Sequence, residues 1–291
     1  MLLSPVMMCH FERQGDQMSK TLEMMNILQE RQQESWPRAH LGASQLGKPC
    51  ERQLWYGFRQ SLQNDHSALT LRRFEDGHRS EALVAEWLSE VVPLTDQQAS
   101  FRRGHWGGSI DGILPEGPLE HPGIPHIWEH KCVSDKKWDQ LEKLLTKLDP
   151  TAAMLKWDRV YYSQGQIYML AMGLEWHWMT VASAGTRKMQ AVRTPLDRIF
   201  AGELEMRAER IVRAHSAPPR ASTDPGAFVC RWCDFKEICH DDAKPEQHCR
   251  TCKWSRPDTD LPAFVCQLKN DHLLDVIEEI QGCDSWCRFF D

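Results

Sequence analysis

The chain of 291 residues has no apolar run long enough to cross a lipid bilayer, which excludes a membrane-spanning protein and predicts no membrane partner. Its first residues, MLLSPVMMCH, are apolar but short, are interrupted by Pro5, and lack a positively charged start. That pattern is not typical of a secretory signal peptide. The sequence also has no internal repeat. We therefore expect a globular protein of the cytoplasm.

An excess of positive charge is missing as well. The formal net charge is −6, so no global positive field predicts binding to a polyanion. Any site for nucleic acid must then be local, or must act through bound cations. The hydrophobic content of 41% and the charged content of 26% are ordinary for a globular protein. The length suits one large domain, or one domain with a small appendage.

Cysteine is abundant, and seven of the 11 cysteines follow Cys230. In a chain without an export signal, such a number indicates a reducing compartment and metal ligation instead of disulfides. The C-terminal part is therefore expected to bind metal.

Hydrophobic spacing and turn residues predict alternating helices and strands. The expected helices cover residues 71–92, 135–148, 159–174 and 195–216, with Pro150 ending the second and Pro195 opening the last. The expected strands cover residues 126–133 and 175–183, and residues 99–114 are expected to form strand, turn and strand. Residues 1–17 are expected to be disordered, with Met18 as an alternative start, residues 19–35 are helix-prone, and residues 217–227 are a linker. This order predicts an α/β core with a C-terminal metal-binding extension.

Two stretches of the core place acidic residues in apolar strands. GGSIDGIL contains Asp111, and HIWEHKC contains Glu129 and Lys131, which share one face because they are two residues apart. If the two strands pair, Asp111 and Glu129 converge with Lys131 beside them. Carboxylates held together repel unless a cation lies between them, and their oxygens suit Mg²⁺ or Mn²⁺. The alternative is an exposed strand face with a weak ion pair.

The pattern Asp111…Glu129-x-Lys131 resembles the PD-(D/E)xK nuclease superfamily, whose core is restriction-endonuclease-like, with a mixed sheet flanked by helices. Gly77-x-x-x-Glu81 resembles the same helix in the λ-exonuclease-like and RecB-like branches, which implies that Glu81 is a third metal carboxylate and that His78 assists. Without the other motifs, Glu81 would be read as a solvated helix acid.

A later helix strengthens the resemblance. Gln164-x-x-x-Tyr168 is similar to a Gln-x-x-x-Tyr motif that follows the catalytic lysine in those branches. Both residues lie on one helix face, and the resemblance implies that they contact the DNA backbone or brace the site. The alternative is a core tyrosine with a hydrogen-bonding glutamine.

Cys230-x₂-Cys233-x₅-Cys239 places three thiolates near one another, and Cys50 is the candidate fourth ligand. One cysteine before the core and three after it resemble the RecB-like nucleases that hold a 4Fe–4S cluster, such as the AddB helicase–nuclease subunit and the CRISPR adaptation nuclease. Ser44, Cys50, Arg52 and Tyr56 resemble the start of that pattern. Such a cluster would close a loop around the core, a restraint on the order of 4–5 kcal/mol. Zinc at the same four thiolates is the alternative.

A second cysteine set follows. Cys249-x₂-Cys252 is typical of a metal hairpin, and we expect a Zn²⁺ site completed by Cys266 and Cys283. His272 or Cys287 are the alternatives for the fourth ligand. The expected division is therefore a nuclease domain over residues 18–240 and a zinc-binding extension over residues 241–291. Cys9 and Cys132 are left over, and Cys132 is expected to be a small buried residue.

The resemblance implies a reaction. Glu81, Asp111, Glu129 and the main-chain carbonyl of His130 would hold one or two Mg²⁺ or Mn²⁺ ions, while Lys131 orients the attacking water. Attack on the phosphodiester would expel the 3′-oxygen and leave a 5′-phosphate. Lys136 and Lys137 would line a DNA groove.

The same resemblance implies an exonuclease that acts on single-stranded DNA or DNA ends, in recombination, repair or phage replication. Its place would be a bacterial or phage-infected cytoplasm, with a helicase, a recombinase or a single-strand-binding protein as partner. The alternatives are a CRISPR-associated prespacer-trimming nuclease, a non-catalytic DNA-binding scaffold that retains the fold, and a regulatory protein that binds only zinc.

Overall fold

The computed structural model describes residues 19–32, 39–63 and 65–289. The expectations for residues 1–17, Met18 and Cys9 lie outside this part of the chain. The α-helices are α1 (Lys20–Arg31), α2 (Glu51–Phe58), α3 (Ala68–Ser89), α4 (Asp135–Leu145), α5 (Pro150–Trp157), α6 (Arg159–Met172), α7 (Arg198–Arg213), α8 (Phe228–Arg231), α9 (Lys236–His240) and α10 (Val276–Gln281). The strands are β1 (Leu41–Gly42), β2 (Ser100–Arg103), β3 (Trp106–Ser109), β4 (Gly112–Leu114), β5 (His126–Val133), β6 (Trp176–Ser183), β7 (Met189–Pro195), β8 (Ser255–Pro257), β9 (Phe264–Cys266) and β10 (His272–Leu273).

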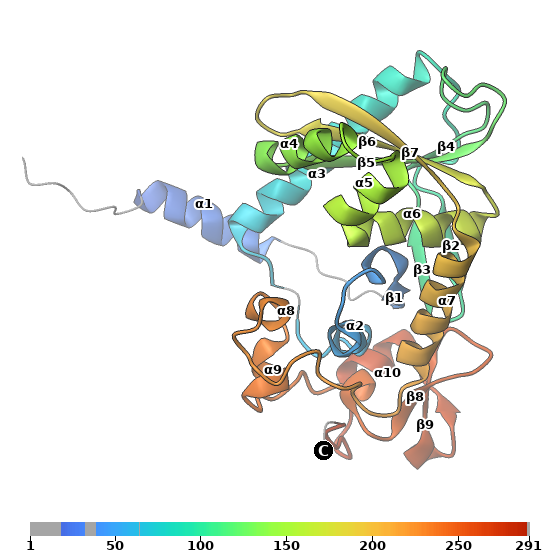
Figure 1. Ribbon diagram of the computed structural model, residues 1–291. Coiled ribbons are helices and arrows are strands. Elements are labelled where there is room, and N and C mark those ends of the chain that lie inside the picture. The colour runs from blue at the N-terminus through green and yellow to red at the C-terminus, as the bar shows by residue number, and fades with distance from the viewer. Residues whose placement is uncertain (1–18, 33–38, 64, 290–291) are drawn as a thin grey trace, which may run out of the picture.

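A mixed sheet of four strands, in the order β4-β5-β6-β7, positions the acidic residues (Figure 1). β5 runs parallel to β6, and both outer pairs are antiparallel. β5 is buried over most of its length, as its apolar sequence predicts. Gly112 pairs with Trp128, so the expected pairing of the two acidic strands is present.

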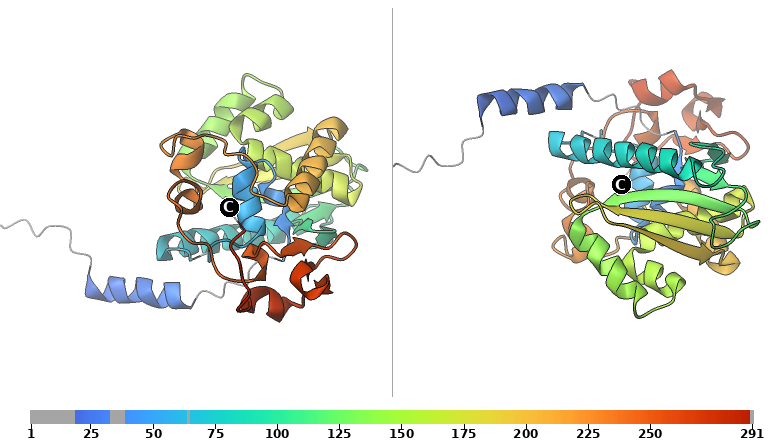
Figure 2. Two further views of the ribbon diagram at one scale, coloured as in Figure 1. Left: turned by 90° about the horizontal axis from the view of Figure 1, so that it is seen from below. Right: turned by 90° about the horizontal axis from the view of Figure 1, so that it is seen from above.

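Helices cover both faces of this sheet. α3 lies along one face, and α4 and α5 lie beyond the other, as the right-hand view of Figure 2 shows. Neighbouring residues of a strand point to opposite faces of the sheet, so β5 contacts one helix on one face and another helix on the other. His130 reaches Ser80 of α3, whereas Glu129 reaches Gln164 of α6.

The expected helix over residues 135–148 is shorter than predicted, and Pro150 has another role. α4 ends at Leu145, and Pro150 opens α5. The carboxylate of Asp149 caps α5 by accepting a hydrogen bond from the amide of Ala152. Proline suits the first turn because its missing N–H would have no helical partner there. The prediction that Pro150 ends a helix was wrong, since α4 ends at Leu145 and Pro150 starts the next helix.

The prediction that Pro195 opens a helix was wrong. Pro195 is the last residue of β7, and α7 begins at Arg198. The reason is Asp197, whose carboxylate accepts hydrogen bonds from the amides of Ile199 and Phe200 and so fixes the helix start. β7 itself was not predicted, because its sequence, MQAVRTP, mixes apolar and polar residues and ends in proline.

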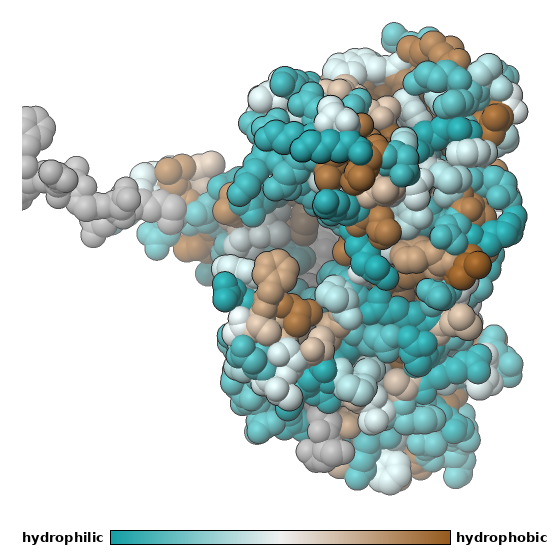
Figure 3. All heavy atoms as spheres, viewed as in Figure 1, coloured by the Kyte–Doolittle hydropathy of each residue, from teal (hydrophilic) through white to brown (hydrophobic). Residues whose placement is uncertain are grey.

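α3 presents only part of its apolar spacing to the sheet. Val84 is buried and Leu88 packs against the same cluster, whereas Leu83, Trp87 and Val91 are exposed. Figure 3 shows that exposed hydrophobic side chains are scattered on the face seen there, among mostly hydrophilic ones. None of the described helices is both long and apolar enough to cross a membrane.

The C-terminal residues share a core with α2. Phe264 and Phe289 belong to the same buried cluster as Trp55 and Phe58. Two buried arginines join the parts as well: Arg59 donates to the carbonyls of Arg250 and Ser255, and Arg250 donates to those of Phe58 and Ala39. Residues after 240 are thus packed against α2 and the residues next to it.

Candidate active site

Asp111 lies between β3 and β4, beside the middle of β5. Its Oδ2 accepts a hydrogen bond of 2.7 Å from the amide of His130. Burial raises the pKa of Asp111, although Lys131 and this hydrogen bond act in the opposite direction. The structure therefore brings Asp111 next to the strand that carries Glu129 and Lys131.

Glu129 is fully buried. Its Oε2 accepts two hydrogen bonds of 2.8 Å, from Nζ of Lys131 and from Nε2 of Gln164. Its other oxygen, Oε1, is buried and has no hydrogen-bond partner among the described residues. Burial raises the pKa of Glu129 to about 8, and the charge of Asp111 adds to the rise while Lys131 opposes it. A buried carboxylate oxygen without a donor is a candidate cation ligand.

Glu81 reaches the same site from α3. Burial and the nearby charge of Asp111 raise its pKa. Its Oε1 accepts a hydrogen bond of 2.5 Å from Nε2 of Gln98. Gln98 was not predicted as a site residue, because it lies in a polar loop without a motif. Its backbone has a φ of 56°, a conformation that is uncommon for a residue other than glycine and that often marks functional sites.

Lys131 completes the group and is 17% exposed. Burial opposes its charge, but the Glu129 and Asp111 carboxylates hold its pKa above its ordinary value. Its Nζ also lies 5.7 Å from the ring centre of Tyr161, which the sequence analysis did not single out. Three carboxylates and one ammonium therefore meet at one place, supplied by α3, β5 and the turn before β4.

The supporting residues fall into two groups. Gln164 and Tyr168 are both buried, and Tyr168 packs against Gly108, where a Cβ atom would stand 2.8 Å from its hydroxyl. Both residues therefore brace the site. His78 and Lys136 are exposed, on α3 and α4. Lys137 is engaged within the chain, because its Nζ donates to Asp158 at 2.5 Å and lies over the ring of Tyr161.

Each carboxylate of the site is held by a donor of the chain. Consistent with this, no group of three or more His, Cys, Asp or Glu side chains in the described ranges is arranged as a metal site. The donor set nevertheless suits Mg²⁺ or Mn²⁺, since it consists of carboxylate oxygens and includes the unpartnered Oε1 of Glu129.

The four cysteines predicted to hold an iron–sulfur cluster line one small cavity between α2, α8 and α9. These residues are Cys50, Cys230, Cys233 and Cys239. Burial raises the pKa of Cys230, and the thiols of Cys239 and Cys50 add to it. Arg52 donates to the sulfur of Cys239 at 3.8 Å. Four thiols around one space, with a cation beside them, fit a negatively charged cluster.

The thiols of the second cysteine set influence one another. Burial, together with Cys283, Cys252 and Cys266, raises the pKa of Cys249 to about 11. Of the two alternatives for the fourth ligand, His272 is otherwise engaged, because its ring contacts Glu278, whereas the thiol of Cys287 stays an alternative. Thiols are the donor type that Zn²⁺ binds in structural sites.

Cys132 differs from the prediction, because it is partly exposed and not buried. It follows Lys131 directly, and the far end of β5 is less covered than its start.

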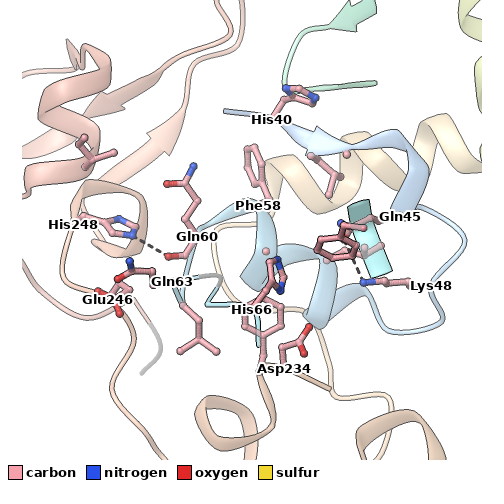
Figure 4. Close-up of a pocket in the computed structure, with 18 residues that line it drawn as sticks. His40, Gln45, Lys48, Phe58, Gln60, Gln63, His66, Asp234, Glu246 and His248 are labelled. Carbon is pink, nitrogen blue, oxygen red and sulfur yellow. Dashed lines mark hydrogen bonds between the residues drawn. The ribbon is translucent and has the colours of Figure 1, made fainter. Parts of the chain in front are cut away.

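A cavity of about 640 Å³ lies apart from the acidic residues (Figure 4). It is lined by polar and aromatic side chains from α2, the start of α3 and the C-terminal part, among them Lys48, Phe58, Asp234, Glu246 and His248. The ring of His248 contacts the carbonyl of Gln60 at 2.9 Å. The described residues that line this cavity carry charges of both signs. Glu81, Asp111 and Glu129 are not among them.

No protein-family model and no curated protein matches the chain. Several solved structures resemble it, among them the following three. A structure of the exonuclease LHK-Exo in complex with dAMP is 15% identical, with 60% of this chain and 86% of that chain covered and a TM-score of 0.40. Another structure of this alkaline exonuclease, from Laribacter hongkongensis, is 16% identical, with 65% and 90% covered and a TM-score of 0.39. The structure of SSO0001 is 14% identical, with 76% and 95% covered and a TM-score of 0.42. These likenesses are distant, so the side chains of the site have to support any proposal about the reaction.

Proposed function

We propose that the protein is a metal-dependent deoxyribonuclease of the PD-(D/E)xK type, which hydrolyses phosphodiester bonds. One observation carries the proposal: the carboxylates of Glu81, Asp111 and Glu129 meet beside Lys131, and Oε1 of Glu129 is buried without a hydrogen-bond partner among the described residues. Burying several negatively charged carboxylates close together is energetically unfavourable, and a bound divalent cation offsets their negative charge.

Glu81, Asp111, Glu129 and the main-chain carbonyl of His130 would hold Mg²⁺ or Mn²⁺. When bound, the ion would supply positive charge that activates water and offsets charge on the phosphate. The chain does the positioning. Gln164 and Lys131 both donate to Oε2 of Glu129, which leaves its Oε1 available to the cation.

Lys131 is placed to act on the substrate. It is the ammonium group held within this acidic site by Glu129, and it is partly exposed. Its remaining protons can hold the attacking water or a phosphate oxygen, where negative charge develops during the reaction. Lys136 and His78, both exposed, would contact the DNA backbone, with Lys137 in support.

The finer proposal is an exonuclease that acts on single strands or DNA ends in recombination, repair or phage replication, with a helicase, recombinase or single-strand-binding partner. It is supported by the sequence resemblance to RecB-like and λ-exonuclease-like nucleases. Prespacer trimming and a non-catalytic scaffold are the alternative functions, and the scaffold predicts DNA binding without cleavage.

Two structural metal groups belong to the proposal. A 4Fe–4S cluster on Cys50, Cys230, Cys233 and Cys239 would tie α2 to α8 and α9, and a Zn²⁺ ion on Cys249, Cys252, Cys266 and Cys283 would hold the C-terminal part together. Support comes from the cavity that the first four cysteines line and from the influence of the other three thiols on the pKa of Cys249. In this proposal residues 18–240 form the nuclease domain and residues 241–291 the zinc-binding extension.

The test of the reaction is cleavage of end-labelled single- and double-stranded DNA by anaerobically prepared protein. We expect cleavage with Mg²⁺ or Mn²⁺, none with EDTA, and a loss of at least about 100-fold in Lys131→Ala. The matched control is Lys156→Ala, which removes an exposed lysine of α5. Equal cleavage by both variants, or no cleavage by folded wild type with metal, would contradict the proposal. The product ladder also gives the polarity.

The test of the structural metals is iron, sulfide and zinc content with visible absorbance. Cys239→Ser should lose iron and the absorbance but keep zinc, whereas Cys249→Ser should lose zinc and keep iron. Cys132→Ser is the matched control and should keep both. Zinc in place of iron at the first set would overturn the cluster but leave the nuclease proposal standing.

A further inference from the structure

The imidazole of His130 joins the strand of the acidic site to its two neighbours. It is buried, on the face of β5 opposite to Glu129. Nε2 of His130 lies 2.9 Å from Oγ of Ser80 in α3, and Nδ1 lies 3.0 Å from Oγ1 of Thr180 in β6. The indole N–H of Trp128 donates to the same Oγ1 at 3.0 Å. One ring therefore bridges a helix and a strand.

The hydrogen-bond pattern assigns the protons. The hydroxyl of Thr180 donates to the carbonyl of Glu129 at 3.4 Å, so its oxygen accepts from both Trp128 and His130. Nδ1 of His130 then carries the proton. Because a neutral imidazole has one donor and one acceptor, Nε2 accepts and the hydroxyl of Ser80 donates to it.

The ends of this bridge are next to the carboxylates. Ser80 directly precedes Glu81, and His130 directly follows Glu129 and donates its amide to Asp111. The buried residues of α3 are Ala68, Val84 and Ala85, so the turn that carries Glu81 has buried apolar residues on its C-terminal side and none on its N-terminal side back to Ala68. A hydrogen bond at Ser80 is placed to fix that turn.

We propose that Ser80 is a positioning residue, which through His130 and Thr180 holds α3 against the sheet so that Glu81 can share a divalent cation with Asp111 and Glu129. The inference rests on the proposed nuclease function and names Ser80 and Thr180, which neither the acidic motif nor the cysteine motifs include, together with the side chain of His130. It predicts that loss of the hydroxyl weakens cation binding more than it weakens the fold, because partners of metal-ligating groups commonly tune affinity about 10-fold or more.

The experiment measures Mn²⁺ binding without DNA, by calorimetry or by the spin-resonance signal of free Mn²⁺. Ser80→Ala should bind about 10-fold more weakly than wild type, and Ser80→Thr, which keeps a hydroxyl, should recover part of that loss. Ser89→Ala is the matched control: it removes a hydroxyl from the same helix that bonds only the carbonyl of Ala85 at 2.7 Å. Its Mn²⁺ affinity should equal that of wild type.

Cleavage gives a second readout. Ser80→Ala should need about 10-fold more Mn²⁺ for half-maximal rate, while its rate at saturating Mn²⁺ stays within about threefold of wild type. If Ser80→Ala does not fold, Thr180→Val breaks the bridge at its other end and should show the same shift.

The outcomes separate the two proposals. If wild type, Ser80→Ala and Ser89→Ala all bind Mn²⁺ tightly and with equal affinity, the positioning role of Ser80 is overturned. The nuclease proposal then stays intact. Wild type that binds no Mn²⁺ overturns the metal site, and the positioning role falls with it.

Discussion

The side-chain amide of Gln164 donates a hydrogen bond of 2.8 Å to Oε2 of Glu129, the same oxygen that accepts from Lys131. A helix three elements further along the chain thus decides which oxygen of the buried carboxylate stays without a partner. The arrangement explains why a glutamine, and not another acid, suits this position.

We expect Gln164→Glu to abolish cleavage almost completely. The replacement has the same shape but places a negative charge against buried Glu129, and like charges in such a site disfavour each other strongly. Cleavage should fall by about 100-fold or more. Gln140→Glu, on the exposed face of α4, is the control and should cleave normally. An active Gln164→Glu would show that the hydrogen bond is not needed.

Gly77→Ala should make the protein more stable and less active. A Cβ at Gly77 meets no atom within 4 Å, so nothing in the chain requires glycine there, although glycine inside a helix costs about 0.5–1 kcal/mol relative to alanine. Gly77 lies one turn before Glu81 on the same face, where a DNA strand would approach.

The matched control for this change is Gly202→Ala in α7, whose Cβ also meets nothing within 4 Å. Denaturant unfolding should show a similar gain of about 0.5–1 kcal/mol in both variants. Only Gly77→Ala should lose cleavage. Equal activity in the two would mean that the substrate does not pass close to Gly77.

Asp111→Asn should stabilise the metal-free protein while it removes activity. The amide oxygen can still accept from the amide of His130, but the change takes away a charge whose pKa is raised by burial. In EDTA we expect the free energy of unfolding to be higher for the variant than for wild type. Added Mn²⁺ should raise the melting temperature of wild type and not that of the variant. If Asp111→Asn is less stable than wild type, the negative charge of Asp111 is already stabilised by neighbouring groups of the protein.

His177 should make the stability depend on pH in acid. Burial lowers the pKa of His177 to about 3, so its imidazole stays neutral in the folded state over a pH range in which it is protonated in the unfolded state, below pH of about 6.5. The unfolded state then binds more protons, and the free energy of unfolding falls by up to about 1.4 kcal/mol per pH unit as the pH drops from 6.5 toward 3. His177→Gln should reduce this slope by one proton, whereas His215→Gln, at an exposed position, should not. Equal slopes for wild type and His177→Gln would contradict the prediction.

Arg250 should be essential for the attachment of the C-terminal residues. Its Nε donates to Glu279 at 2.7 Å, and both side chains are buried. Arg250→Ala leaves Glu279 buried without its cation and should cost about 3–5 kcal/mol in the free energy of unfolding. Arg250→Met combined with Glu279→Gln removes both charges and should cost clearly less. A double variant as unstable as the single one would place the effect in the hydrogen bonds to Ala39 and Phe58.

The sequence by itself determined which chemistry is available. The two-residue spacing of Glu129 and Lys131 placed them on one strand face, and the short spacings Cys230-x₂-Cys233-x₅-Cys239 and Cys249-x₂-Cys252 kept those thiols close along the chain. The composition of residues 126–133 and the turn residues before them predicted a strand, because both are local properties of the chain. Local patterns did not predict β7, in which apolar and polar residues are mixed and which pairs with β6.

Only the tertiary structure decided what surrounds these groups. Gln98 reaches Glu81 across 17 residues, and Ser80 reaches His130 across 50, through contacts that no spacing in the sequence encodes. Packing likewise left Leu83 and Trp87 of α3 exposed, although their spacing resembles that of core residues. The physical reason is that burial depends on which elements meet, and the burial of Glu129 beside Asp111 is what turns a strand carboxylate into a candidate metal ligand.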